Sequence, residues 1–448
     1  MEPEELEDPA AADVDIDEEH GDEMAELIDA EIIETLDGND MPAPSDDDDD
    51  DDADGDCDGA GSAADAGAPA AAPVVDESAV QLREHTGAVY ALAISPTVPT
   101  LVASGGGDDR AFLWDVTAGS AGAVRRELVG HRDTVNALEF SHDGVYLATA
   151  GLDGVVAVWS AADGLLACTL EGPSEAVNWL AWHSRGHVLL AGSEDTTCWM
   201  WKVPEGECMQ IFAAHAASVT CGAFSGDGRA IVTGSDDATV RVWHPRTGQV
   251  AHCVTVGTPV AIDGADGAVS CLACHPVNAV AIFGLADGRV QLLHLDKGTV
   301  LAQWYEHASC VEAVGFCPLA SVPGAPAALG ALAASAALDG SLCVWDTNTL
   351  SLRQKLAHPD GVSAMRWHPA APLLATAGLD GIARVWDARS GLLLRAFSGH
   401  TQGLLDVLFA PLGGDAGALV TASDDGMARV FQFDVSAAVA AAVGASAP

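Results

Sequence analysis

The segment from His131 to Trp159 reads HRDTVNALEFSHDGVYLATAGLDGVVAVW, and its pattern decides the fold of the whole chain. VNALEF alternates, the turn SHDG leads into YLATAG, and the tight turn LDG leads into VVAVW. Short alternating runs separated by turns that contain Gly and Asp are typical of antiparallel strands. The segment therefore predicts three consecutive strands of one sheet.

Four residues of this segment can form a continuous chain of hydrogen bonds. We expect Asp153 to accept from the ring of His131, the ring to meet the hydroxyl of Thr149, and that hydroxyl to meet the indole N–H of Trp159. Such a chain pairs polar groups that the packed sheets would otherwise leave unsatisfied, and it holds the turn against the sheet. Its spacing, with Thr ten and Asp six residues before the Trp, can be sought along the rest of the chain.

This spacing recurs throughout the sequence. The Asp is repeated at Asp108, Asp153, Asp195, Asp237, Asp287, Asp339, Asp380 and Asp425. The matching strand ends are Trp114, Trp159, Trp201, Trp243, Leu293, Trp345, Trp386 and Phe431. The hydroxyl is supplied by Ser104, Thr149, Thr233, Ser335, Thr376 and Thr421, and the leading histidines are His85, His131, His215, His307, His358 and His400. Five repeats carry all four members; the eighth lacks only the Trp, the third has Ala191 and no His, and the fifth keeps little beyond Asp287.

The strand ends lie 41 to 52 residues apart, close to the WD40 period of about 40–45 residues. Four strands per repeat form a blade, and blades stacked radially bury their faces against their neighbours. The sequence therefore predicts an all-β fold, a WD40 β-propeller with eight blades. No fourth strand follows Phe433, so we expect the segment Ser78–Glu84 to supply the outer strand of the last blade and close the ring.

Composition divides the chain of 448 residues into three parts. Residues 1–77 hold 31 of the 66 acidic residues, and no Lys or Arg precedes Arg83, so most of the formal net charge of −47 lies in this segment. The remainder keeps 35 acids against 19 basic residues, a net charge of about −16. We predict a disordered acidic tail over residues 1–77, the propeller over 78–435 and a disordered C-terminal tail over 436–448.

This charge restricts the partners. The tail and the propeller both repel nucleic-acid phosphates and anionic membranes, and they attract a basic protein. No apolar run is long enough to span a bilayer, the 11 cysteines lie mostly within strand patterns, and no signal peptide precedes them. We therefore expect a monomeric protein of the cytoplasm, with the nucleus as an alternative, that does not bind nucleic acid directly.

Three patterns resemble sites of chemistry, and each has a simpler explanation. The His/Ser/Asp sets look like hydrolase triads, but five copies fixed to the blade frame indicate a structural role. Cys271 and Cys274 resemble half of a zinc site without a second pair, and Cys274 takes a core position. Residues 54–65 match the offsets of a calcium loop, but Asp65 replaces the bidentate Glu and no helices flank it. We predict no enzymatic activity, no cofactor and no specific metal.

Two features of the tail leave alternatives open. The segment Glu23–Asp37 places apolar residues on one helical face, which fits either a helix that forms on binding or a transiently helical tail; they are Met24, Leu27, Ile28, Ile32 and Leu36. The run Asp46–Asp52 is most simply solvated charge, and attraction of a basic partner is the alternative.

In a propeller, the usual docking surface is formed by the starts of the innermost strands and by the turns between the second and third strands. We call it the entrance face. The residues predicted to contact a partner there are Tyr90, Asn136, Asn178, Glu194, Asp236, Glu312 and Asp424, and Thr220, Ser270 and Ser363 take equivalent positions. None is Lys or Arg and four are acidic, so we predict that the entrance face binds a positively charged segment, with Tyr90 as an aromatic anchor.

The third-repeat segment AWHSRGHVLLAGSEDTTCWMWKVPEGEC resembles the angio-associated migratory cell protein family of WD40-repeat proteins, most specifically in WMWKVPEGE at Trp199–Glu207. SGGGDDRAFLWD in the first repeat, LDGIARVWDARSGLLLRAFSGHT around the seventh and eighth, and EIIETLD in the tail add to the likeness. This family is similar to a fungal ribosome-assembly factor, an eight-bladed propeller whose acidic face escorts one newly made basic protein of the large ribosomal subunit. The resemblance implies a dedicated, non-enzymatic chaperone for such a ribosomal protein. The alternative is a general WD40 scaffold or adaptor in signalling, cell migration or ubiquitin-ligase complexes.

Overall fold

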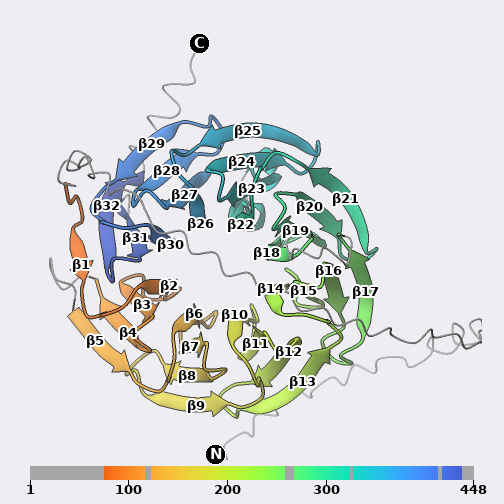
Figure 1. Ribbon diagram of the computed structural model, residues 1–448, viewed down its shortest axis with the longest axis horizontal. Helices are drawn as coiled ribbons and strands as arrows, with labels where there is room; N and C mark the ends of the chain where they lie inside the picture. Colours follow the sequence, from red (N-terminus) through yellow and green to blue (C-terminus); the bar gives the residue numbers. More distant parts are fainter. Residues whose placement is uncertain (1–74, 117–122, 258–266, 323–325, 412–415, 436–448) are drawn as a thin grey trace, which may run out of the picture. The chain divides into compact units, whose positions relative to one another are not determined.

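The chain folds into eight four-stranded antiparallel sheets arranged as blades around a central axis (Figure 1). This computed structural model describes residues 75–116, 123–257, 267–322, 326–411 and 416–435. Residues 71–448 form one compact unit, and the description concerns that unit. The eight-bladed β-propeller predicted from the repeats is confirmed.

The first seven blades each take four consecutive strands, from the innermost to the outermost. The first blade comprises β2 (Val89–Ile94), β3 (Leu101–Gly106), β4 (Ala111–Asp115) and β5 (Ala123–Leu128), and the second β6 (Val135–Phe140), β7 (Tyr146–Gly151), β8 (Val156–Ser160) and β9 (Leu166–Leu170). The third comprises β10 (Val177–Trp182), β11 (Val188–Ser193), β12 (Thr197–Lys202) and β13 (Glu207–Ala213), and the fourth β14 (Val219–Phe224), β15 (Ile231–Ser235), β16 (Thr239–Trp243) and β17 (Val250–Thr255).

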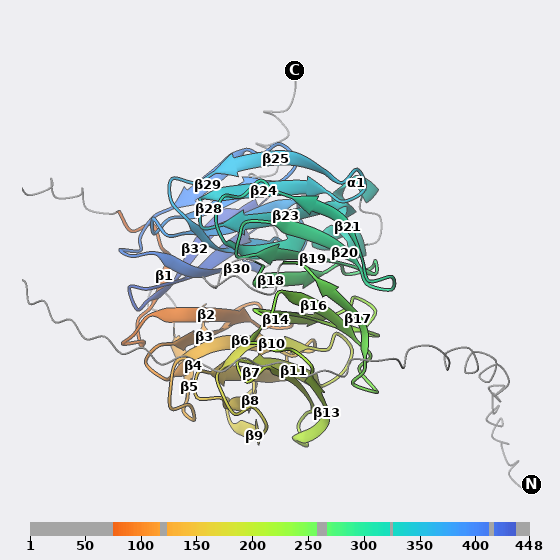
Figure 2. The same ribbon diagram turned by 45° about the vertical axis from the view of Figure 1, so that its right-hand side comes forward.

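The second half of the ring repeats this order. The fifth blade comprises β18 (Val269–Cys274), β19 (Val280–Leu285), β20 (Val290–His294) and β21 (Thr299–Trp304), and the sixth β22 (Val311–Phe316), β23 (Leu332–Ala337), β24 (Ser341–Asp346) and β25 (Ser351–Ala357). The seventh comprises β26 (Val362–Trp367), β27 (Leu373–Gly378), β28 (Ala383–Asp387) and β29 (Leu393–Phe397). Figure 2, a view turned toward the right-hand side of the ring, shows the outer strands β13 and β25 at its rim.

Between β22 and β23 the sixth blade carries a short 3₁₀-helix, Pro318–Ser321, and a single helical turn, α1 (Ala327–Gly330). None of the helices in the described ranges is long and apolar enough to cross a membrane.

Neighbouring blades are held together by apolar side chains from the facing sheets. Leu101 and Leu113 of the first blade pack in one buried cluster with Phe140 and Trp159 of the second. Because each cluster of this kind lies between two blades, no blade completes its core alone. The ring must therefore be closed for every face to be covered.

The eighth blade closes the ring with a strand from the other end of the propeller sequence. It consists of β30 (Leu404–Pro411), β31 (Ala416–Ser423) and β32 (Ala428–Asp434), with β1 (Val80–Leu82) as its outer strand. In the β1–β32 register Val80 lies opposite Val430 and Leu82 opposite Ala428. The predicted closure by the segment 78–84 is confirmed.

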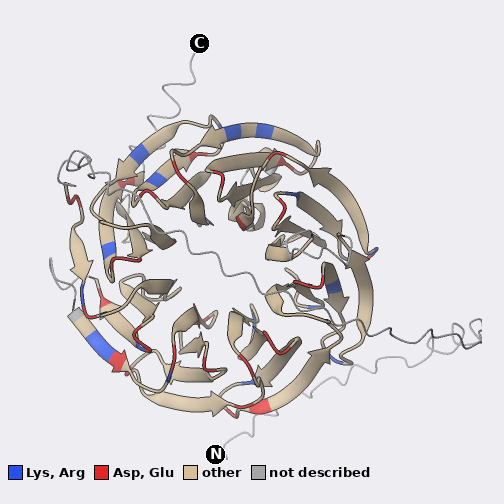
Figure 3. Ribbon diagram, in the orientation of Figure 1, with Lys and Arg blue, Asp and Glu red and all other residues tan. Residues whose placement is uncertain are grey.

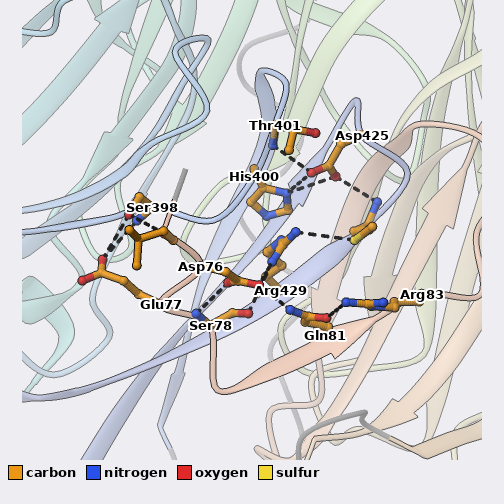
Figure 4. Close-up of polar contacts among 12 residues, drawn as sticks. Asp76, Glu77, Ser78, Gln81, Arg83, Ser398, His400, Thr401, Asp425 and Arg429 are labelled. Atoms are coloured by element: carbon orange, nitrogen blue, oxygen red, sulfur yellow. Dashed lines mark hydrogen bonds and ion pairs between the residues drawn. The ribbon is translucent and has the colours of Figure 1, made fainter. Parts of the chain in front are cut away.

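A polar cluster reinforces this closure (Figure 4). Arg429 of β32 ion-pairs with Asp76, and Asp76 also accepts from the backbone N–H of Ser78 at 2.9 Å. The backbone N–H of Glu77 donates to the carbonyl of Ser398 at 3.0 Å. Burial raises the pKa of Asp76, but the hydrogen bonds from Ser78 and the charge of Arg429 outweigh it and set the value at about 2.

These contacts bear on the boundary predicted at residue 77. The predicted tail includes Asp76 and Glu77, yet Asp76 pairs with Arg429 of the eighth blade and Glu77 bonds to Ser398, the residue after β29. The charge of these two residues indicates a continuation of the acidic tail. Their partners, Ser398 and Arg429, lie 321 or more residues away in sequence, so local composition does not reveal them. The predictions for residues 23–37, 46–52 and 54–65, and for the C-terminal tail, lie outside the described residues.

Candidate functional site

The repeated His, Ser or Thr, Asp and Trp residues meet inside the blades. In the second blade His131 Nδ1 lies 3.2 Å from Asp153 Oδ1, His131 Nε2 lies 2.8 Å from Thr149 Oγ1, and the Trp159 indole donates to the same hydroxyl at 2.9 Å. Because a carboxylate only accepts, Nδ1 carries the proton and Nε2 accepts from the hydroxyl. The first and fourth blades repeat this arrangement with His85, Ser104, Asp108 and Trp114, and with His215, Thr233, Asp237 and Trp243.

Two predicted sets depart from this geometry because another side chain is inserted. In the sixth blade the hydroxyl of Ser341 stands between His307 and Asp339, whose nearest charged atoms are 3.9 Å apart. The rest of that set is as expected, with Ser335 accepting from Trp345 at 2.8 Å.

In the seventh blade Arg384 separates the ring of His358 from Asp380. Thr376 accepts from Trp386 at 3.0 Å, so the inner half of that set is retained. The direct His–Asp contact predicted for these two blades is therefore wrong. The spacing predicts the four members of each set, but it does not predict that Ser341 or Arg384, on the third strand of the blade, also reaches the turn that carries the Asp.

The incomplete repeats use substitutes. In the third blade the indole of Trp201 donates to the carbonyl of Glu171 at 3.1 Å, where other blades use a hydroxyl. In the fifth blade Arg289 pairs with Asp287 at 2.5 Å. In the eighth blade His400 keeps both its bonds, to Asp425 at 3.0 Å and to Thr421 at 2.8 Å. All these sets are enclosed in the blade frame, where they fix turns rather than expose a reactive group.

The predicted partner positions coincide with a recurring backbone irregularity. In every blade the register between the two innermost strands shifts by one residue, for example between Val135 and Ala137. In seven of the eight blades the extra residue is a predicted position, namely Tyr90, Asn136, Asn178, Thr220, Ser270, Glu312 or Ser363. A bulge re-aims the side chain of its extra residue. The bulges therefore decide where these side chains point.

Four of these side chains turn to the next blade. Thr220 donates to the carbonyl of Val269, Ser270 to that of Val311 at 2.5 Å, and Ser363 to that of Leu404 at 2.6 Å. The amide of Asn178 donates to Ser218 at 2.9 Å. These polar groups bridge adjacent blades and thereby help to hold the ring together.

The acidic and aromatic positions remain accessible. Tyr90 is 43% exposed, and Glu194, Asp236 and Asp424 are all exposed. Asn136 and Glu312 are half-buried. The entrance face therefore keeps one aromatic side chain and three exposed carboxylates of the predicted set.

Glu194 and Asp236 belong to neighbouring blades and repel each other. Partial burial raises the pKa of Asp236, and the charges of Asp237 and Glu194 raise it further. Negative charge is thus concentrated at this part of the entrance face, and a cation bound there would lower the electrostatic free energy.

Sequence reasoning missed four further exposed acids at this face. They lie in the turns that begin the innermost strands or join the second and third strands: Asp109, Asp133, Glu175 and Asp360. For Asp109, Asp133 and Asp360 the available signal is a position one or two residues after a repeated His or Asp, and for Glu175 it is a position two residues before the start of β10. Three arginines of the same turns and strand starts are paired with acids: Arg110 with Glu127 at 3.2 Å, Arg289 with Asp287, and Arg384 with Asp380.

The charges are distributed unevenly over the propeller. Figure 3 shows Asp and Glu in the turns around the inner part of the ring, and several Lys and Arg on the outer strands β5, β25 and β29. The opposite face, at the other ends of the innermost strands, is mixed, with exposed basic residues Arg185, Lys202, Arg229, Arg246 and Lys297 beside the acids Asp163, Glu205, Asp227 and Asp296. The entrance face is therefore the more strongly acidic of the two.

The innermost strands carry one charged cluster that the sequence did not indicate. The guanidinium of Arg366 on β26 lies 3.5 Å from Asp406 on β30. Glu139 on β6 accepts from the backbone N–H of Trp182 at 2.9 Å, and burial raises its pKa to about 8 in spite of that bond and the charge of Arg366. The charge of Arg366 is thus paired with Asp406 of the next blade, whereas Glu139 is mostly protonated at neutral pH.

The two cysteines of the half zinc pattern both lie on β18. Residues three apart on a strand face opposite sides of the sheet, so Cys271 and Cys274 do not converge on one ion. Burial raises the pKa of Cys274 to about 12, which keeps its thiol protonated. The described cysteines are all free.

Comparison with known proteins identifies WD-repeat proteins as relatives of this chain. The profile of the family described as "WD domain, G-beta repeat" matches residues 77–115, 122–160, 164–202, 206–244, 350–387 and 391–432. The angio-associated migratory cell protein of Canis lupus familiaris is 32% identical over 80% of this chain and 80% of its own length. An uncharacterised WD repeat-containing protein of Schizosaccharomyces pombe is 34% identical over 81% of this chain and 88% of its own.

Among solved structures, the chain resembles Sqt1 of Chaetomium thermophilum bound to the N-terminus of the ribosomal protein L10. The two are 25% identical, with a TM-score of 0.69, over 80% of this chain and 100% of that one. The family profile skips residues 245–349, yet the fifth blade lies entirely within that range. A blade that has lost most of the sequence signature therefore keeps the same strand order.

Proposed function

Because this chain belongs to the WD40-repeat family of the angio-associated migratory cell protein, we propose that it is a dedicated, non-enzymatic chaperone for a basic protein of the large ribosomal subunit. The single observation that carries this proposal is the acidic entrance face, with exposed Glu194, Asp236 and Asp424. The Chaetomium thermophilum Sqt1 structure, which contains the N-terminus of a ribosomal protein, supports a client of that kind.

The mechanism that we propose is charge neutralisation. Carboxylates on the entrance face pair with Lys and Arg of the client, which shields them from RNA until assembly. Rim charges of this kind mainly accelerate association, while an aromatic side chain in the contact area contributes more of the affinity. Tyr90, which packs against Gly107 and stays 43% exposed, takes that second role.

A charge reversal on the entrance face tests the proposal. Glu194→Lys with Asp236→Lys should weaken binding of a basic ribosomal-protein segment at least tenfold and reduce its dependence on salt. The melting temperature should stay nearly unchanged, because both side chains are exposed. The matched control is Asp163→Lys with Asp227→Lys, two exposed acids of the opposite face, which should leave binding unaltered. Equal binding by both double variants would show that the entrance face is not the site.

A second candidate is a general scaffold or adaptor. The outer strands favour it, because they expose large apolar side chains on several blades, namely Leu166, Met209, Ile211, Val300, Leu301, Leu352 and Leu393. Pulldown with the full chain followed by mass spectrometry separates the two candidates. One stoichiometric basic ribosomal protein supports the chaperone, and several signalling or ubiquitin-ligase subunits support the scaffold. We further propose a monomer that acts in the cytoplasm, with the nucleus as the alternative.

A further inference from the structure

Two hairpins at the opposite face bring three ligating side chains together. The hairpin between β6 and β7 carries His142 and Asp143, and the hairpin between β10 and β11 of the next blade carries His187. Asp143 Oδ2 lies 2.8 Å from His187 Nε2. One ligand atom from each of the three side chains lies within 4.8 Å of the other two.

The carboxylate and one imidazole of this cluster are held in position. Asp143 Oδ1 accepts from the hydroxyl of Ser141 at 2.7 Å and from the backbone N–H of Val145 at 3.2 Å, which leaves Oδ2 directed at His187. The ring of His187 stands edge-on to Tyr146, with centroids 5.0 Å apart. Groups that orient ligands in this way reduce the reorganisation that metal binding requires.

A simple ion pair between Asp143 and His187 does not explain the position of His142, the third side chain of the cluster. A half-buried His–Asp pair at the surface accounts for Asp143 and His187 by itself, and surface pairs contribute little to stability. It gives no reason for the exposed ring of His142 to lie against that of His187, at 5.7 Å between centroids. Two imidazoles and a carboxylate form a donor set that suits Zn²⁺ and similar ions.

We propose that His142, Asp143 and His187 bind one divalent transition-metal ion, with Zn²⁺ as the best fit, across the hairpins of the second and third blades. Donor atoms around tetrahedral zinc lie about 3.3–3.6 Å apart, since each bond is about 2.0–2.2 Å long. On binding, the Asp143–His187 distance lengthens from 2.8 Å, and rotation of the exposed His142 side chain brings its nitrogen within range. The fourth position is open to water or to a ligand from a partner.

The fourth blade supplies a matched control. Its hairpin has the same carboxylate clamp, with Asp227 accepting from Ser225 at 2.7 Å and from the backbone N–H of Arg229 at 3.0 Å. Gly226 stands where His142 stands in the second blade. Asp227→Asn therefore alters an equivalent turn without removing a histidine ligand.

The test is a Co²⁺ titration of the full chain, followed by displacement with Zn²⁺. The acidic tail attracts cations loosely, so the visible absorption of histidine-bound Co²⁺ is the readout. We expect one equivalent to bind to the wild type and to Asp227→Asn. His142→Gln should bind at least tenfold more weakly, and the signal should be lost in His187→Gln.

Circular dichroism and thermal melting in the presence of chelator check the folding of each variant. Because His142 is exposed, His142→Gln should remain folded, so the proposal can still be tested if His187→Gln is unstable. Equal Co²⁺ binding by all four proteins would overturn the proposal. So would a loss confined to His187→Gln, because His142 would then not be a ligand.

Discussion

Arg384 Nη1 lies 3.2 Å from His358 Nδ1, and this contact reverses the tautomer of the ring. A guanidinium only donates, so Nδ1 of His358 must accept, and Nε2–H then donates to Thr376 Oγ1 at 3.1 Å. In the second blade the polarity is opposite, because Asp153 accepts from His131 Nδ1. A carboxylate and a guanidinium at the same place in the blade thus fix opposite proton positions.

This reversal predicts different nitrogen protonation for the two rings. In the histidine ¹H–¹⁵N correlation spectrum of the labelled protein at neutral pH, we expect His358 to carry its proton on Nε2 and His131 on Nδ1. The same tautomer at both positions would contradict the assignment.

Removal of the inserted arginine should destabilise the seventh blade. Arg384 is buried and forms two bonds to Asp380, at 3.1 and 2.6 Å, so Arg384→Met leaves a partly buried carboxylate without its partner. We expect a loss of about 3 kcal/mol in the free energy of unfolding, measured by urea denaturation. The control Arg353→Met removes an exposed arginine, 3.9 Å from Asp346, and should cost less than about 1 kcal/mol.

Stability should fall as the pH is lowered from 6.5 to 4. Burial lowers the pKa of both His307 and His358 to about 4, and the charge of Arg384 also lowers that of His358. In the unfolded chain these rings are protonated near pH 6.5. The unfolded state thus binds more protons within this window, so the free energy of unfolding rises with pH across it.

Denaturation at several pH values checks this dependence. His307→Asn should flatten the pH slope between about pH 4.5 and 6, because one of the buried rings with a lowered pKa no longer titrates. His244→Asn, which changes an exposed histidine, should leave the slope as it is. An unchanged slope in His307→Asn would contradict the prediction.

The closure of the ring should depend on Asp76. The pKa of Asp76 is about 2, so the carboxylate is charged above about pH 4, and its stabilising contact with Arg429 is lost only as pH falls through about 2. At neutral pH Asp76→Asn should lower the free energy of unfolding by about 1–3 kcal/mol, because buried Arg429 loses its charged partner. Glu84→Gln, an exposed acid just after β1, is the control. Equal melting temperatures for the two variants would show that the ion pair does not strengthen the closure.

The hydroxyls between blades should matter for stability and not for binding. Thr220→Val, Ser270→Ala and Ser363→Ala each remove a bond to the carbonyl of the next blade, at a cost of about 1 kcal/mol. Affinity for a basic ribosomal-protein segment should stay at the wild-type value in all three. Weaker binding with unchanged stability would show instead that these side chains contact the bound segment.

The sequence alone determined the number of blades, the order of their strands, the closing strand and most of the hydrogen-bonded sets. The blades and the hydrogen-bonded sets depend on contacts within one repeat, so a fixed spacing reports them, and the closing strand follows because the last repeat lacks a fourth strand. For the sixth and seventh blades the spacing predicts the members of each set but not the contact between His and Asp, because Ser341 and Arg384 of the third strand lie between them.

Only the tertiary structure decided which side chains meet between blades. The bulges turn Thr220, Ser270 and Ser363 toward neighbouring strands, and two hairpins 44 residues apart bring Asp143 to His187. The periodicity of the sequence reports how strands pair within one sheet. It carries no information on how one sheet is rotated against the next, and that rotation sets every contact across the ring.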